Sequence, residues 1–114
     1  MATRSYMTNR GYLYILRCSD GSYYVGSTTN PDTRVAQHQS GEGGSYTSPR
    51  LPVSLVYSCE FPSLYEAFLR ERQVKGWSRR KKEALIRSDY DALVKLSKSK
   101  AIPSLSRDPS TGSG

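Results

Sequence analysis

Cysteine is scarce in this chain of 114 residues, which has two, Cys18 and Cys59. Two cysteines are too few for a disulfide-stapled scaffold or a cysteine-rich zinc site, so we expect a protein of the reducing cytoplasm. Long apolar runs are also lacking, and no stretch approaches the roughly 18 residues of a membrane-spanning helix. The first residues contain no apolar core of a secretory signal. Membrane and disulfide-rich classes are therefore not expected.

Acidic residues are few compared with basic ones. The chain has 10 Asp and Glu against 17 Lys and Arg, which gives a formal net charge of +7 at pH 7. A positive excess favours a polyanionic partner such as nucleic acid, although many basic surfaces bind nothing. Hydrophobic residues make up 36% of the chain, and nine tyrosines supply part of the missing apolar area. The length suits one domain with one core.

Composition divides the chain into three parts. Residues 1–10 are a polar lead-in, and residues 11–95 alternate apolar and charged segments, which predicts a single domain. From residue 96 to residue 114 the chain is rich in Ser, Lys, Gly and Pro. Such a segment buries too little surface to offset its ordering entropy, so we expect a flexible tail.

Local patterns predict the element order ββαβααα. Strands are expected at 12–18, 23–26 and 53–61, helices at 31–40, 63–75 and 78–87, and a last helix capped by Ser88. Alternation in the third strand predicts one shared face for Val53, Leu55, Tyr57, Cys59 and Phe61. The order indicates an α+β domain in which helices flank a small, three-stranded, mostly antiparallel sheet.

Five polar side chains on these elements are candidates for a site. Tyr14 and Tyr24 lie on the first two strands, Arg34 and His38 on the first helix, and Glu66 at the start of the second. Arg34 and His38 are four residues apart and so share a helix face. That helix has few apolar residues, and a polar face turned inward is costly unless function requires it. His38 is also the chain's single histidine.

The turn between the first two strands decides whether Tyr14 and Tyr24 share a face of the sheet. A two-residue turn would put them on opposite faces, because side chains alternate along a strand. A three-residue turn over 19–21 pairs Tyr14 with Gly26 and brings Tyr24 to the same face. We therefore predict the longer turn, with a positive φ at Gly21. The opposite face would then carry Leu13, Ile15 and Val25 for the core.

The order and spacing of these residues resemble the GIY-YIG endonuclease superfamily. The resemblance is carried by Tyr12-Leu13-Tyr14, Tyr24-Val25-Gly26, Arg34, His38 and Glu66, and it covers residues 11–87. The small stand-alone bacterial members are the most similar. The first triplet departs from the pattern, because Tyr12-Leu13-Tyr14 stands in place of Gly-Ile-Tyr. We also find no match to the C-terminal Asn of some relatives.

The resemblance implies hydrolysis of phosphodiester bonds at one Mg²⁺ or Mn²⁺ ion. Glu66 would be the metal ligand, and one carboxylate suffices because Mg²⁺ keeps several waters. Arg34 would stabilise the transition state, and His38 would bond a tyrosine hydroxyl. One tyrosine would be the general base, with Tyr14 preferred and Tyr24 holding the water or phosphate. Glu66 also has a purely structural reading, since it completes a capping box after Ser63.

Other residues are candidates for holding the substrate. Gly26, Ser27 and Thr28 stand where a phosphate could approach, although Gly26 could simply end its strand. Tyr46 and Trp77 could stack on unpaired bases, and Trp77 could equally be a core residue. Basic side chains could follow a phosphate backbone, and those most favoured are Arg50, Arg72, Lys75 and Arg79, within a wider set of Arg4, Arg10, Arg17, Arg70, Arg80, Lys81 and Lys82.

The expected substrate is DNA that is single-stranded, flapped or branched, as in repair or recombination. A sequence-specific duplex site is less favoured, because nothing in the 114 residues reads as an appended sequence-reading domain. RNA remains open as a substrate, and no membrane or protein partner is implied. Two other functions are compatible with the sequence: a catalytically inactive, basic nucleic-acid-binding module on the same scaffold, and a basic protein-interaction domain.

Overall fold

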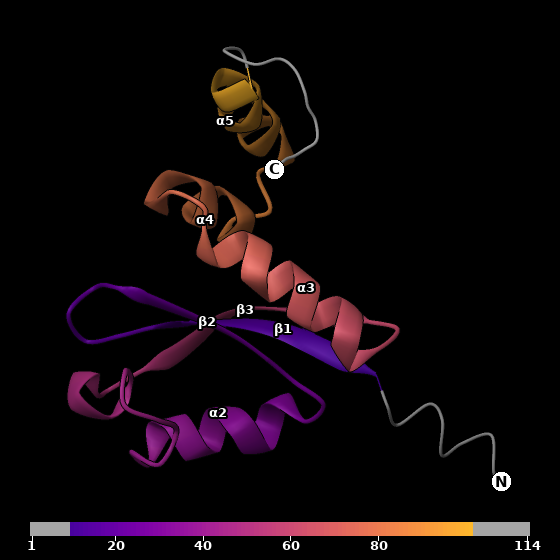
Figure 1. Cartoon of the computed structure of the whole chain (residues 1–114). Coiled ribbons are helices and arrows are strands. Elements are labelled where there is room, and N and C mark those ends of the chain that lie inside the picture. Colours follow the sequence, from indigo (N-terminus) through magenta and orange to yellow (C-terminus); the bar gives the residue numbers. More distant parts are fainter. Residues whose placement is uncertain (1–9, 102–114) are drawn as a thin grey trace, which may run out of the picture. The chain divides into compact units, whose positions relative to one another are not determined.

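The computed structural model describes residues 10–101, and the side chains of residues 10–97 (Figure 1). The polar lead-in through residue 9 and the tail from residue 102 lie outside the described residues. The chain divides into two compact units, residues 1–75 and 76–114. The first unit contains the sheet, two helices and all five candidate residues, and the second contains two further helices.

Three strands form the sheet, namely β1 (Gly11–Arg17), β2 (Tyr23–Thr28) and β3 (Ser54–Phe61). Their order is β2-β1-β3, and both neighbouring pairs are antiparallel. The predicted α+β class with a small three-stranded sheet is confirmed. Because β1 lies in the centre of the sheet, β2 is one of its two edge strands.

Two helices lie on opposite sides of the sheet, α2 (Pro31–Gln39) and α3 (Leu64–Lys75) (Figure 1). The Asn30 side chain caps α2 by accepting a hydrogen bond from the Thr33 backbone N–H at 3.2 Å. Gly41 follows the helix with a φ of +90°, a conformation that favours glycine at a helix end. The loop after it contains one short 3₁₀ turn, η1 (Ser48–Arg50).

The β1–β2 hairpin has the predicted three-residue turn. Tyr14 pairs with Gly26, and Leu16 pairs with Tyr24, so that the two tyrosines share a face. Gly21 has a φ of +85°, and its N–H donates to the Cys18 carbonyl at 2.9 Å. On the opposite face the expected aliphatic residues are buried, and they are Leu13, Ile15 and Val25.

The third strand corrects one prediction. The β1–β3 register shifts by one residue, because Ile15 pairs with Tyr57 whereas Leu16 pairs with Leu55. Val56 is the extra residue, and side-chain alternation restarts there. The five residues expected on one face are therefore divided between two. Val53 packs on the tyrosine side of the sheet, in a buried cluster with Tyr14, Leu16, Cys18 and Val35.

The second unit contains α4 (Arg79–Ile86) and α5 (Tyr90–Ala101). The predicted cap of the last helix is wrong by one residue. The Ala92 N–H donates to the Asp89 carboxylate at 3.1 Å, while Ser88 has a φ of +58° and precedes the cap. In addition, α5 continues past residue 95, where the tail was expected to begin. Within residues 10–101, no helix is both long and apolar enough to cross a membrane.

Candidate active site

Three aromatic rings meet on the α2 side of the sheet. The ring centroids of Tyr14 and Tyr24 are 6.3 Å apart, and the His38 ring lies 5.7 Å from the first and 5.0 Å from the second. The three-residue turn brings the tyrosines to this face, and the turn of α2 brings His38 to it. Three residues from three elements thus form one cluster, as the sequence predicted for a shared site.

The His38 side chain is buried and has a partner at each ring nitrogen. Its Nε2 lies 3.0 Å from the Tyr14 hydroxyl, and its Nδ1 lies 2.7 Å from the Thr47 hydroxyl. Burial lowers the pKa of His38 below its usual 6.5, and the Arg34 guanidinium lowers it further. The imidazole is therefore neutral at pH 7 and carries a single N–H.

Arg34 extends along α2 toward the same cluster. Its Nη1 donates to the Gln37 side chain at 3.0 Å, and its Nη2 donates to the Gly43 carbonyl at 3.2 Å. These two bonds fix one side of the guanidinium. The guanidinium lies close enough to Tyr14 and His38 that its positive charge lowers the pKa of both side chains. The predicted grouping of arginine, histidine and tyrosine is present.

The Tyr14 hydroxyl lies over the edge strand at Gly26. A Cβ on Gly26 would collide with the Tyr14 ring and hydroxyl, so only glycine leaves room for the tyrosine there. The close neighbour of Gly26 is thus a side chain, and the strand runs on to Thr28. Burial raises the pKa of Tyr14 to about 12, and the nearby Tyr24 adds to the rise.

A carboxylate that the sequence analysis missed reaches this edge from the other side of the sheet. Glu71 of α3 accepts a hydrogen bond from the Ser27 hydroxyl at 2.5 Å, and its side chain is 12% exposed. Its other oxygen lies 2.6 Å from the Lys75 ammonium. The negative charge of Glu71 also raises the pKa of Tyr14, as expected for groups at a common site.

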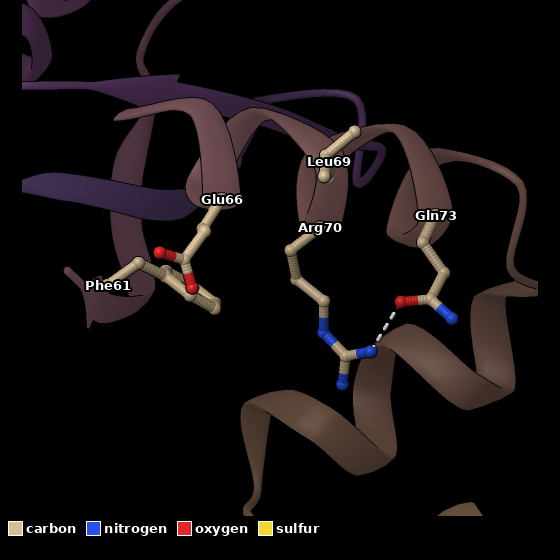
Figure 2. A pocket seen from close by; sticks show the side chains of 5 residues that line it. All are labelled: Phe61, Glu66, Leu69, Arg70 and Gln73. Atoms are coloured by element: carbon tan, nitrogen blue, oxygen red, sulfur yellow. Dashed lines mark hydrogen bonds between the residues drawn. The ribbon is translucent and has the colours of Figure 1, made fainter. Parts of the chain in front are cut away.

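The carboxylate that the sequence favoured, Glu66, has a different environment. Its backbone N–H donates to the Ser63 hydroxyl at 3.2 Å, and that hydroxyl donates to its carboxylate at 3.3 Å, as in a capping box. Its side chain borders a pocket on α3 together with Phe61, Leu69, Arg70 and Gln73 (Figure 2). In the part of the chain that the structure describes, no hydrogen bond joins Glu66 to the tyrosine cluster.

Helix geometry explains why the two glutamates differ. Residues 66 and 71 are five positions apart, which is roughly 140° around a helix. Glu66 shares its face with Arg70 and Gln73, whereas Glu71 shares the buried stripe of Ala67 and Val74. A glutamate inside an apolar stripe is the signal that could have identified Glu71 from the sequence.

The predicted substrate contacts near the hairpin are partly engaged with one another. Tyr46 stacks beside Tyr24, with ring centroids 5.9 Å apart, and the Arg50 guanidinium lies 3.9 Å from the Tyr46 ring centre. Arg50 also pairs with Asp20 at 3.1 Å. The Tyr24–Tyr46–Arg50 stack therefore continues from the buried cluster to the surface. Thr28 instead accepts a hydrogen bond from the Asn30 backbone, just before α2.

The remaining basic candidates occupy three different environments. Arg72 is exposed on α3, with its guanidinium 5.9 Å from the Phe68 ring centre. Lys75 is held beside the site by its pair with Glu71. Arg79 belongs to the second unit, where it pairs with Glu83 at 2.9 Å.

Comparisons with known proteins identify the family to which the chain is similar. The sequence profile of the GIY-YIG catalytic domain matches residues 10–84. The UPF0213 protein BH0048 of Halalkalibacterium halodurans is 48% identical over 89 residues, which cover 75% of this chain and 95% of that protein. A UPF0213 protein of Streptococcus pneumoniae serotype 4 is 44% identical over 85 residues, which cover 75% of this chain and 86% of that protein. These relatives are small proteins that consist mostly of the matched region.

Two solved structures are also similar to the chain. The NMR structure of UPF0213 protein BH0048 from Bacillus halodurans is 47% identical, with a TM-score of 0.47 over 77% of this chain and 97% of that one. The NMR structure of EF2693 from E. faecalis is 36% identical, with a TM-score of 0.49 over 71% and 86%. None of these names states an activity or a metal. The profile match spans more than half of the chain, and the chain therefore belongs to the GIY-YIG family of nuclease domains.

Proposed function

We propose that this protein is an endonuclease that hydrolyses DNA phosphodiester bonds with the help of one divalent metal ion. The observation that carries the proposal is the meeting of five side chains at the β2 edge, namely Tyr14, Tyr24, Arg34, His38 and Glu71. They supply a proton acceptor, a cation for the phosphate and an anion for a metal. These are the parts that metal-assisted hydrolysis requires.

The metal ligand in this proposal is Glu71, which takes the role first expected of Glu66. Its carboxylate is a hard oxygen donor, it is largely buried, and it lies beside the Ser27 hydroxyl. Within residues 10–101 there is no cluster of three or more His, Cys, Asp or Glu, so a protein cage for the metal is absent from that region. A single carboxylate fits Mg²⁺ or Mn²⁺ with retained waters. When bound, the ion would supply Lewis-acid charge beside the scissile phosphate.

Tyr14 is the proposed general base. Its hydroxyl is held by His38, and it lies at the edge where Glu71 and Arg34 both act on it electrostatically. With a pKa of about 12, Tyr14 is almost entirely protonated at pH 7. Positive charge is needed to free the phenolate, and Arg34 already acts in that direction because it lowers the pKa of Tyr14. Tyr24, which packs against His38, would hold the water or phosphate.

Arg34 is the proposed partner of the scissile phosphate. Gln37 and Gly43 hold two of its N–H groups, and this pre-orients the planar fork before substrate arrives. A fixed guanidinium can donate to two phosphate oxygens at once and can stabilise the charge that grows in the transition state. The pre-orientation also lowers the entropy cost of that interaction.

The proposed substrate is single-stranded, flapped or branched DNA, of the kind formed in repair or recombination. The net charge of +7 suits a phosphate backbone. The stack of Tyr24, Tyr46 and Arg50 leads from the site to the surface and could border an unpaired base. RNA with the same unpaired character is the competing substrate.

The test is a panel of end-labelled substrates at one salt concentration, with Mn²⁺ and with EDTA. The panel contains single-stranded, duplex, flap and junction DNA and a single-stranded RNA. We expect Mn²⁺-dependent cleavage, fastest on the single-stranded, flap and junction forms. Binding without cleavage on every substrate would instead identify an inactive nucleic-acid-binding module. A failure to bind any of them would contradict both readings.

A further inference from the structure

The Glu71 carboxylate has a different partner at each of its two oxygens. One oxygen accepts a hydrogen bond from the Ser27 hydroxyl, and the other lies 2.6 Å from the Lys75 ammonium. Ser27 belongs to β2 and is paired with Leu13 across the hairpin, so its position is fixed by the sheet. Lys75 is the last residue of α3, and its side chain is 50% exposed. One largely buried carboxylate thus contacts a fixed neutral donor and a cation on a long, flexible stem.

The Ser27 hydroxyl orients the carboxylate without bringing positive charge to it. An ionised carboxylate only accepts hydrogen bonds, so the hydroxyl hydrogen points at Glu71. Carboxylates that bind metals are commonly oriented by such an outer hydrogen bond, and its loss weakens metal binding. The contact from Ser27 therefore supports the binding of a cation by Glu71.

The Lys75 ammonium acts in the opposite direction, because it is itself a cation at the same carboxylate. A divalent ion held by Glu71 would lie close to the ammonium, and like charges at short range repel. The ammonium can move away at little cost, since it is half exposed and exposed ion pairs contribute little to stability. Lys75 and the ion therefore compete for Glu71.

We propose that Ser27 is a positioning residue for Glu71, and that Lys75 is a built-in competitor that leaves the carboxylate when a divalent ion binds. This inference rests on the proposed function, in which Glu71 holds the ion. It predicts that the two partners of one carboxylate have opposite effects on metal affinity. Two contacts that merely held the glutamate in place would both support binding.

The direct test is the affinity for Mn²⁺ alone, measured without nucleic acid at one pH and one salt concentration. The electron paramagnetic resonance signal of free Mn²⁺ falls as the ion binds and gives the dissociation constant. We expect Lys75→Met to bind Mn²⁺ about tenfold more tightly than the wild type. Ser27→Ala should bind it about tenfold more weakly. An unchanged or weaker affinity in Lys75→Met would overturn the competition, and an unchanged affinity in Ser27→Ala would overturn the role of Ser27.

Conservative and control variants test the cause of each effect. Lys75→Arg keeps the positive charge, and Ser27→Thr keeps the hydroxyl, so both should bind Mn²⁺ with an affinity near that of the wild type. Lys95→Met removes an exposed lysine of α5, in the other unit, and Ser54→Ala removes an exposed serine of β3. We expect no change in either control. An equal gain in Lys95→Met would reflect net charge alone and would overturn the specific role of Lys75.

The departure of Lys75 can be observed by NMR of the lysine ammonium groups. The signal that is missing in Lys75→Met is that of Lys75, and its ¹⁵N shift and proton exchange report whether the ammonium is paired. During a titration with Mg²⁺ we expect this signal to change to that of an unpaired, rapidly exchanging lysine. A Lys75 signal that stays unchanged when Mg²⁺ saturates the protein would overturn the displacement.

Cleavage measurements separate this inference from the proposed function. A wild-type protein that shows the expected pattern of Mn²⁺ affinities but cleaves no substrate would refute the nuclease proposal and support the inference. A wild-type protein that cleaves with Mn²⁺, while Lys75→Met binds the ion no more tightly, would overturn the inference and leave the nuclease proposal standing. If neither the wild type nor Lys75→Met binds Mn²⁺, Glu71 is not a metal ligand and the inference is wrong.

Discussion

At the scale of single residues, the His38 ring is held from both sides. It is buried, both ring nitrogens are hydrogen bonded, and Arg34 lies close enough to disfavour a second positive charge. A protonated His38 donates from both ring nitrogens, so the hydroxyl that donates to the neutral ring would have to turn away. Protonation would also place a positive charge in a buried position. The folded protein therefore prefers neutral His38 more strongly than the unfolded chain does.

This preference predicts a loss of stability in mild acid. Because folding lowers the pKa of His38 from 6.5, the unfolded state binds more protons below that pH. The contribution is fully present above about pH 6.5 and is lost as the pH falls toward the folded pKa. Denaturant unfolding between about pH 7.5 and about pH 5.5, above the range where most carboxylates titrate, should show the decline. In His38→Gln the decline should be absent, and an equal decline in both proteins would contradict this account.

The two glutamates show what could be predicted about the site from the sequence. The structure brings Tyr14, Tyr24, Arg34 and His38 together, as expected from strand parity and helix spacing, while their roles stay a prediction. The glutamate that would bind the metal was harder to predict, because a glutamate in the first turn of a helix that follows Pro-Ser suits a capping box as well as a metal site. Only the orientation of α3 on the sheet separates the inward Glu71 from the outward-facing position 66, and that orientation depends on tertiary packing.

At the scale of elements, the edge strand β2 and the central strand β1 depend on each other at one point. Tyr14 reaches over Gly26, so a glycine on one strand is matched to a tyrosine on the next. The hairpin register was predictable, because a three-residue turn alone puts both tyrosines on one face. The register shift at Val56 was not, because a bulge leaves no local sequence signal comparable to an Asp-Gly turn.

We predict that Gly26→Ala destabilises the hairpin by about 1–3 kcal/mol, since the new methyl group collides with the Tyr14 ring. Denaturant unfolding measures the change. In a Gly26→Ala and Tyr14→Leu double variant the shorter side chain should relieve the collision, so the two losses should be less than additive. Fully additive losses would show that the two residues do not interact as described.

At the scale of the whole molecule, the positive charge is partly neutralised by internal ion pairs. Asp20, Glu71 and Glu83 each pair with a basic residue that could otherwise contact a phosphate, namely Arg50, Lys75 and Arg79. Not all 17 basic residues are thus available to a nucleic acid. The charge that remains belongs to both units and would act through general electrostatic attraction more than through base recognition.

The salt dependence of binding should reflect this charge. For single-stranded DNA the logarithm of the binding constant should fall linearly with the logarithm of salt concentration, with a slope of about −0.7 for each phosphate contacted. Fluorescence anisotropy over several salt concentrations, in EDTA to prevent cleavage, measures it. We expect a slope equivalent to several phosphates. Binding that does not change with salt would favour a protein-interaction domain over a nucleic-acid enzyme.

The central claim is that Glu71, at the β2 edge with the tyrosines, is the carboxylate on which cleavage depends. The most direct measurement is Mn²⁺-dependent single-turnover cleavage by Glu71→Gln and Glu66→Gln. Glutamine keeps the shape at both positions, can complete the capping box after Ser63, and is a poor ligand for a hard cation. We predict a loss of about 100-fold or more for Glu71→Gln and near-normal cleavage and melting temperature for Glu66→Gln. The opposite result, an active Glu71→Gln and an inactive but folded Glu66→Gln, would contradict the account.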